Sequence, residues 1–280
     1  MADRLRIGTA GIPISTHNNK GDTISGIEDL RKVHKLDAME LEFVHSVNIK
    51  EEKAILVKEV AKKNDIKLTC HGQYYINLNS NEKEKIEASK KRILNAAKRA
   101  YQCGAWSMVF HAAFYMKQEP RKVFETVEKE FKNIMKEVKD NNLDIWIRPE
   151  TTGKPTQFGD LNELLELSQK FDKVMPCIDF SHLHARSNGK YNSSEEFKFV
   201  FEQVEKALGK EGLNNMHIHL SGIEYGRKGE KHHLTLDNSD MNYKNLIKSW
   251  KDFKVKGVVI CESPNIEEDA KLIKSVWDKG

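Results

Sequence analysis

Six short apolar runs in this chain each end in a histidine or a carboxylate. Their last residues lie 40, 39, 29, 40 and 43 positions apart, about the length of a strand, a helix and two loops. These six terminal residues are His71, His111, Glu150, Asp179, His219 and Glu262. The spacing predicts that each one ends a separate parallel strand. It also makes metal binding the first function to consider.

The same alternation of short β-rich runs and amphipathic stretches extends over the whole chain. Strands are predicted over residues 5–9, 37–43, 66–71, 107–111, 143–149, 174–179, 214–220 and 256–262, and helices over 24–35, 50–64, 81–103, 119–139, 159–172, 193–208, 241–252 and 266–278. Eight such pairs favour an α/β fold, the closed (β/α)8 TIM barrel, which needs about 250 residues and leaves no sheet edge exposed. No linker divides the chain, so residues 1–280 are expected to form a single barrel domain.

An open, doubly wound sheet is the alternative fold. It would usually carry a glycine-rich phosphate turn after its first strand, and Gly8-Thr-Ala-Gly11 lacks the required spacing. The longest connections with no regular structure expected are 180–192 and 221–240. Both follow strands, so in a barrel they should lie on the face that carries the active site, at the carboxyl ends of the strands.

The composition and the length of the apolar runs predict where the protein resides. Apolar residues make up 39% of the chain, and the longest apolar runs have the length of a strand rather than of a membrane span. The start Met-Ala-Asp-Arg-Leu-Arg lacks the apolar stretch of a signal peptide. We therefore expect a cytoplasmic monomer with no membrane partner. The net charge of +4 is compatible with a phosphate-bearing partner.

Side-chain alternation along the strands predicts which residues point into the barrel. In the run 215–220, His217 and His219 should face inward, with His219 in the upper layer. The same parity places Arg148 beneath Glu150, and Cys177 beneath Asp179. The four cysteines show no C-x-x-C spacing, so they are expected to be small buried core residues without a catalytic role.

Two loops add further candidate ligands. Asp179-Phe-Ser-His182 follows the sixth strand, and Glu230-Lys-His232 follows the seventh; His184 and His233 are candidates to support these ligands from outside. Five imidazoles and four carboxylates exceed what one ion accepts, so a cluster of two or three metal ions is expected. The mixed nitrogen and oxygen ligands point to Zn²⁺, with Mn²⁺ or Fe as further candidates.

These residues resemble the endonuclease IV family, the metal-dependent apurinic/apyrimidinic endonucleases of base excision repair. The resemblance is strongest in His71-Gly-Gln-Tyr-Tyr-Ile-Asn-Leu78, Cys177-Ile-Asp-Phe-Ser-His182, His219-Leu-Ser, Gly229-Glu-Lys-His232 and Cys261-Glu-Ser-Pro264. It implies three zinc ions: one held by His71 and His111; a second held by Asp179, His219 and Glu262, with Glu150 bridging the two; and a third held by His182, Glu230 and His232.

The resemblance also implies the reaction. Duplex DNA carrying an abasic lesion would be cut on the 5′ side of the lesion, leaving a 3′ hydroxyl and a 5′ deoxyribose phosphate. Glu150 would orient the nucleophile as the catalytic residue, and Tyr74 would fill the gap left by the missing base.

The chain also departs from that family. Glu230 stands where the family usually has Asp, and Thr151 stands where it has Asn. Segment 43–49 lacks the Gln and Arg residues with which bacterial members probe DNA. Two alternatives therefore stay open. One is a xylose isomerase-like sugar isomerase or epimerase, which holds one or two cations mainly through carboxylates. The other is a non-catalytic DNA-binding barrel.

Overall fold

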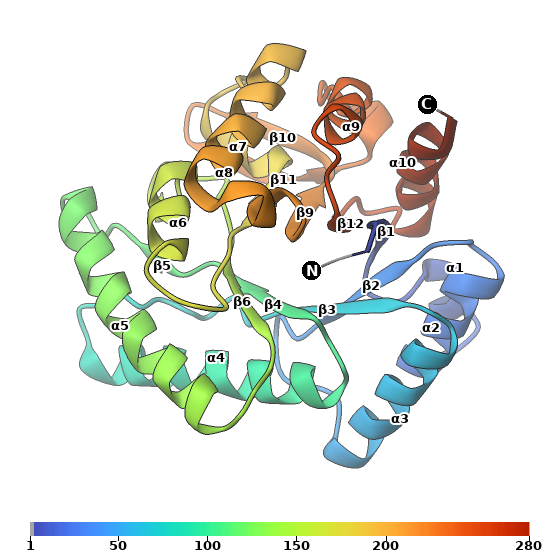
Figure 1. The fold of residues 1–280 in the computed structure, drawn as a ribbon, viewed down its shortest axis with the longest axis horizontal. Helices are drawn as coiled ribbons and strands as arrows, with labels where there is room; N and C mark the ends of the chain where they lie inside the picture. Colours follow the sequence, from blue (N-terminus) through green and yellow to red (C-terminus); the bar gives the residue numbers. More distant parts are fainter. Residues whose placement is uncertain (1–2, 280) are drawn as a thin grey trace.

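The computed structural model describes residues 3–279. Its main sheet has eight parallel strands in the order β6-β4-β3-β2-β1-β12-β9-β8. Bridges between Ile147 and Val174 and between Glu150 and Cys177 join the two ends of this sheet. The result is a nearly closed barrel surrounded by helices (Figure 1), so the predicted TIM-barrel fold is confirmed.

The barrel strands are β1 (Leu5–Ala10), β2 (Ala38–Glu42), β3 (Lys67–His71), β4 (Ser107–Phe110), β6 (Trp146–Pro149), β8 (Cys177–Asp179), β9 (Met216–Leu220) and β12 (Gly257–Cys261). The helices are α1 (Ile14–Asn18), α2 (Thr23–Lys32), α3 (Glu51–Lys63), α4 (Lys83–Gln102), α5 (Pro120–Asp140), α6 (Leu161–Ser168), α7 (Phe180–Arg186), α8 (Ser194–Leu213), α9 (Tyr243–Asp252) and α10 (Glu267–Lys279), with a short 3₁₀ turn η1 (Leu236–Asn238). Two small sheets pair β5 (Ala113–Phe114) with β7 (Gln157–Phe158), and β10 (Gly222–Gly226) with β11 (Gly229–Leu234).

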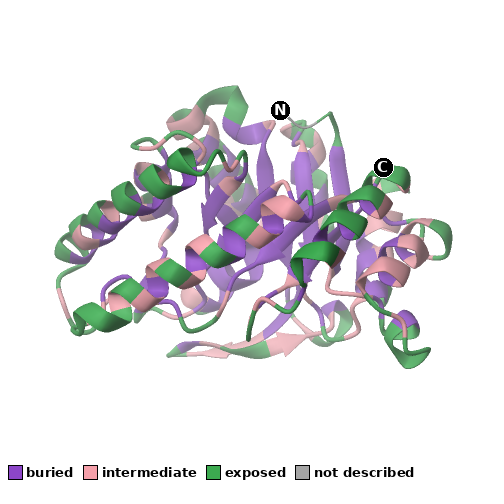
Figure 2. Cartoon of the chain, turned by 90° about the horizontal axis from the view of Figure 1, so that it is seen from below, coloured by how far each residue is buried: buried purple, intermediate pink, exposed green. Residues whose placement is uncertain are grey.

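The helices cover the barrel through apolar stripes. In α5, Val123, Val127, Phe131, Ile134 and Val138 recur every three or four positions, and all five are buried. This spacing places them on one face of the helix. Figure 2 shows the same division throughout: buried strands in the centre, and helices exposed only on their outer sides. None of the helices within 3–279 has the length and apolar character needed to cross a membrane.

The two connections expected to be irregular contain regular structure, so that expectation was wrong. After β8 the chain passes directly into α7, because the side chain of Asp179 accepts a hydrogen bond from the backbone N–H of His182 and so caps the helix. After β9, strands β10 and β11 form a hairpin whose turn is closed by Gly229 at φ +87°, a backbone conformation that glycine adopts readily. Both elements lie at the carboxyl ends of the barrel strands.

Candidate metal centre

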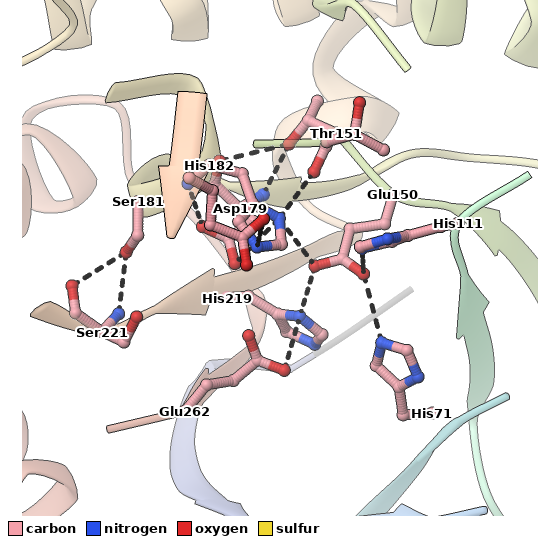
Figure 3. A network of polar contacts seen from close by, with 12 residues as sticks. His71, His111, Glu150, Thr151, Asp179, Ser181, His182, His219, Ser221 and Glu262 are labelled. Atoms are coloured by element: carbon pink, nitrogen blue, oxygen red, sulfur yellow. Dashed lines mark hydrogen bonds and ion pairs between the residues drawn. The ribbon is translucent and has the colours of Figure 1, made fainter. Parts of the chain in front are cut away.

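Candidate ligands converge at the carboxyl ends of the strands (Figure 3). Among the strand-end residues, two groups have ligand atoms that all lie within 4.8 Å of one another. The first is His71, His111 and Glu150, and the second is Glu150, Asp179, His219 and Glu262. The structure thus brings together the six strand-end residues that the spacing singled out. Glu150 belongs to both groups.

The two oxygens of Glu150 face different histidines. Its Oε2 lies 3.3 Å from Nε2 of His71 and 3.0 Å from Nε2 of His111, and its Oε1 lies 2.9 Å from Nδ1 of His219. Two ligands of one tetrahedral zinc ion, each about 2.0–2.1 Å from the metal, are separated by roughly 3.3 Å. The distances between Glu150 and the three histidines are therefore close to those between ligands of one ion, and Glu150 could serve two ions at once.

Asp179 is held by the start of α7 yet keeps one oxygen available. Its Oδ1 accepts the N–H of His182 at 2.7 Å, while its buried Oδ2 has no hydrogen-bond partner among residues 3–279. Nε2 of His111 is likewise buried without a hydrogen-bond partner in that range. Unpaired buried polar atoms are costly unless a ligand satisfies them. The residues present therefore fit a cation at this position.

Backbone carbonyls orient two of the imidazoles. Nδ1 of His71 donates to the carbonyl of Gly72 at 2.8 Å, and Nδ1 of His182 donates to the carbonyl of Thr151 at 2.9 Å. Because a carbonyl can only accept, Nδ1 keeps its hydrogen, and Nε2 is the nitrogen that can give up its proton to a cation. Nε2 of His71 faces Glu150, and Nε2 of His182 faces Glu230, 3.6 Å away. This is how a residue behind a metal ligand fixes the ligand's tautomer.

The third predicted group is only partly assembled as expected. His182 and Glu230 lie together, but the side chain of His232 is 59% exposed and pairs with Glu224 instead. His233 lies on the inner side, and its ligand atom groups with those of Asp179 and His182. The expected place of His232 beside His182 is therefore corrected to His233.

A β-bulge explains that exchange. In the hairpin, Glu224 pairs with His232 and Tyr225 pairs with Glu230, so Lys231 is an extra residue between two successive pairs. An extra residue shifts the alternation of side chains along a strand. Glu230 and His233 therefore face the same side, whereas regular alternation would have put Glu230 with His232.

Close packing of carboxylates and imidazoles shifts their pKa values. Burial would raise the pKa of Glu150, but the charges of His219 and His111 outweigh it and hold that pKa well below its usual range. Burial would lower the pKa values of His71 and His182. Glu150 instead raises that of His71 to about 10, and Asp179 raises that of His182 to about 9. The carboxylates thus attract positive charge, which protons or metal ions can supply.

Other polar residues surround the centre. Tyr74 is 57% exposed, and its ring centroid lies 5.7 Å from that of His71, at the mouth of the barrel. His184 is turned away and contacts the Lys190 carbonyl and Asp240. Glu40, on β2, was not singled out from the sequence, and its side chain points into the barrel toward His219. Its Oε1 lies 3.0 Å from Nε2 of His219.

This fold, with candidate metal ligands gathered at the carboxyl ends of the strands, defines a class of TIM barrels. A family profile described as xylose isomerase-like TIM barrel matches residues 29–276. The chain belongs to this family.

The chain is also similar to individual relatives and to solved structures. It is 45% identical to an uncharacterized protein of Methanocaldococcus jannaschii, over 98% of this chain and 97% of that protein. It is 29% identical to a probable endonuclease 4 of Oceanobacillus iheyensis, over 59% and 55% of the two chains. The structure resembles endonuclease IV from Thermus thermophilus, with a TM-score of 0.75, 17% identity and coverage of 99% and 98%. It also resembles a D-tagatose 3-epimerase-like protein, with a TM-score of 0.70, 16% identity and coverage of 89% and 91%. At these identities the two structural likenesses show the fold alone.

Proposed function

We propose that this protein is a metal-dependent phosphodiesterase that cuts duplex DNA on the 5′ side of an abasic site. The observation that carries the proposal is the sharing of Glu150 between two ligand groups, one with His71 and His111 and one with Asp179, His219 and Glu262. A carboxylate whose two oxygens face different ligand groups suits a pair of cations. Paired cations are typical of enzymes that hydrolyse phosphodiesters.

Bound Zn²⁺ ions, or Mn²⁺ or Fe in their place, would lower the pKa of water and neutralise charge on the phosphate. In the proposed reaction Glu150 orients the attacking water, because its carboxylate lies between the two groups of ligands. His182, Glu230 and His233 form the third side of the centre, where they can hold a cation near the phosphate. The likeness to the probable endonuclease 4 supports this assignment.

Two features near the centre suit a DNA duplex. Tyr74 is exposed beside His71, where its ring can enter the space of a missing base. The turn of the β10–β11 hairpin carries Arg227 and Lys228, which are both exposed and form no ion pair among the described residues. Such cations can contact backbone phosphates. They offer a binding surface separate from segment 43–49, which lacks the expected probe residues.

A duplex with one tetrahydrofuran abasic analogue tests the proposal. Metal-replete protein should incise it on the 5′ side of the analogue, and Glu150→Gln should lose the activity and part of the bound metal. Glu268→Gln, on the exposed side of α10, is the matched control and should cut normally. Failure of the metal-replete wild-type protein to cut, or full activity of Glu150→Gln, would contradict the proposal.

A sugar isomerase or epimerase is the second candidate, and a separate observation favours it. Glu150, Asp179, His219 and Glu262 alone could complete a site for one cation. A cavity of about 380 Å³ is lined by Glu40, Glu42 and Gly11 among others, a volume within the range of small-molecule sites. It adjoins this group through Glu40, whose Oε1 lies 3.0 Å from Nε2 of His219. Turnover of a ketohexose without DNA incision would favour this function. Metal-independent DNA binding without either reaction would favour the non-catalytic barrel.

A further inference from the structure

A second set of polar side chains lies beneath the metal centre. Glu40 on β2, Cys177 on β8, and His217 and His219 on β9 are all fully buried. Ligand atoms of Cys177, His217 and His219 lie within 4.8 Å of one another. Glu40 lies against the two imidazoles, with Oε1 3.0 Å from Nε2 of His219 and Oε2 3.4 Å from Nε2 of His217.

The atoms that face one another in this set have no hydrogen-bond partner. Across residues 3–279 this holds for both oxygens of Glu40 and for Nε2 of His217 and of His219. The atoms are close, but they do not meet the geometry of N–H···O hydrogen bonds. Such atoms are expensive to bury unless something satisfies them together. The distances from the oxygens of Glu40 to Nε2 of His219 and of His217 are again close to the roughly 3.3 Å that separates two ligands of one tetrahedral zinc ion.

The orientation of the two rings favours a ligand between them. Nδ1 of His217 lies 3.0 Å from Oγ of Ser107; when the hydroxyl accepts, the lone pair of His217 lies on Nε2, toward Glu40. Nδ1 of His219 lies 2.9 Å from Glu150 in the upper centre. His219 therefore turns Nδ1 toward Glu150 in the upper centre and Nε2 toward Glu40 beneath it.

Neighbouring charges do not satisfy the set. Arg148 is also fully buried, but its guanidinium donates to the carbonyls of Pro176 and Asn215, and no ion pair joins it to Glu40 among the described residues. Burial raises the pKa of the Cys177 thiol well above its usual range. A bound cation would reverse that effect, because a coordinating thiol loses its proton.

We propose that Glu40, Cys177, His217 and His219 form a further metal site beneath the centre, and that this site takes a zinc-type divalent cation. Thiolate and imidazole ligands select such ions over Mg²⁺ or Ca²⁺. Binding displaces the thiol proton of Cys177, while Nδ1 of His219 stays beside Glu150. With Cys177, His217 and His219 as three ligands and Glu40 as the fourth, the site would have no open position, so the cation is assigned a structural role. This assigns to Cys177 a role that the sequence did not indicate.

Cobalt substitution tests this site independently of any DNA or sugar reaction. Metal-free protein is titrated with Co²⁺ and its near-ultraviolet absorption is recorded. A thiolate-to-cobalt charge-transfer band is expected in the wild-type protein and should be lost in Cys177→Ser, together with about one equivalent of bound metal. Cys103→Ser is the matched control: Cys103 is buried at the end of α4 and joins none of the ligand groups among the described residues, so it should keep the band. Glu40→Gln should weaken binding of this one equivalent.

Zinc X-ray absorption of the wild-type protein gives a readout that needs no variant. One sulfur ligand per chain is expected in the zinc shell. Absence of sulfur from that shell, absence of the cobalt band, or equal metal content in wild type and Cys177→Ser would overturn the site. Any of those results would mean that no cation is bound to Cys177 beneath the metal centre. They would leave the upper centre and its proposed reaction unaffected.

Discussion

The carboxylate of Glu230 and the imidazole of His233 both reach His182, although an odd number of positions separates them along β11. Oε2 of Glu230 lies 3.6 Å from Nε2 of His182, and the ring centroids of His233 and His182 are 5.6 Å apart. The bulge at Lys231 makes this possible. The third group of candidate ligands is therefore a product of one irregular residue.

His233→Ala should remove metal from this third group, because it deletes an inward imidazole beside His182. Up to one equivalent per chain is expected to be lost, as measured by atomic emission after dialysis at limiting free zinc. His232→Ala is the matched control in the same hairpin, and its side chain points to solvent beside Glu224. Loss of metal from His232→Ala with none from His233→Ala would show that the hairpin binds in the regular register.

The sequence predicted the barrel and its inward residues because both follow from simple periods. His217 and His219 alternate with apolar neighbours on one strand, and their inward direction follows from the pleat. The identity of the third-group histidine could not be predicted in this way, because a bulge depends on pairing with a distant strand. The capping of α7 by Asp179 was similarly hidden, since the segment 180–186 is too short to show a clear helical period.

Gly153→Ala should disturb the third group without touching a ligand. A Cβ at position 153 would lie 2.6 Å from Oε2 of Glu230 and 3.1 Å from Cδ2 of His182, so the carboxylate must move. We expect weaker binding of one metal equivalent and a loss of about 1–3 kcal/mol in the free energy of unfolding, the usual range for overpacking. Calorimetric zinc titration and urea unfolding measure the two effects.

Gly226→Ala provides the control for that substitution. A Cβ there would approach only Cε of Lys231, at 3.6 Å, an ordinary contact. Its metal content and stability should remain close to those of the wild-type protein. Equal behaviour of the two alanine variants would contradict the placement of Glu230 against Gly153.

The metal-free protein should lose stability as the pH rises. Burial opposes protonation of His71 and His182, but neighbouring carboxylates raise their pKa values to about 10 and about 9, against about 6.5 in the unfolded chain. A raised histidine pKa contributes stability that is complete below the unfolded value and disappears as the pH passes the folded value. The free energy of unfolding should therefore fall between about pH 6.5 and pH 10.

Bound metal should remove that dependence, because cations replace the protons on the ligand histidines. Urea unfolding across this pH range, with chelator and with zinc, makes the comparison. The double variant His71→Gln/His182→Gln should show a smaller decline than the wild type when both are metal-free. If the free energy of unfolding of the metal-free wild-type protein did not change over this pH range, the neighbouring carboxylates would not be raising the pKa values of these histidines.

Tyr74→Ala should weaken binding to abasic DNA more than Tyr75→Ala. The two tyrosines are neighbours with similar exposure, 57% and 61%, but the ring of Tyr74 is the one beside His71, 5.7 Å between centroids. If its ring occupies the space of the missing base, its removal should cost about 1–3 kcal/mol of binding free energy, the range for one aromatic stacking partner.

Fluorescence anisotropy with the cutting-deficient Glu150→Gln protein can compare abasic and intact duplexes. Tyr74→Ala should lose preference for the abasic duplex, while Tyr75→Ala should keep it. Equal losses in both variants, or on both duplexes, would indicate a general surface contact and leave lesion recognition to other residues.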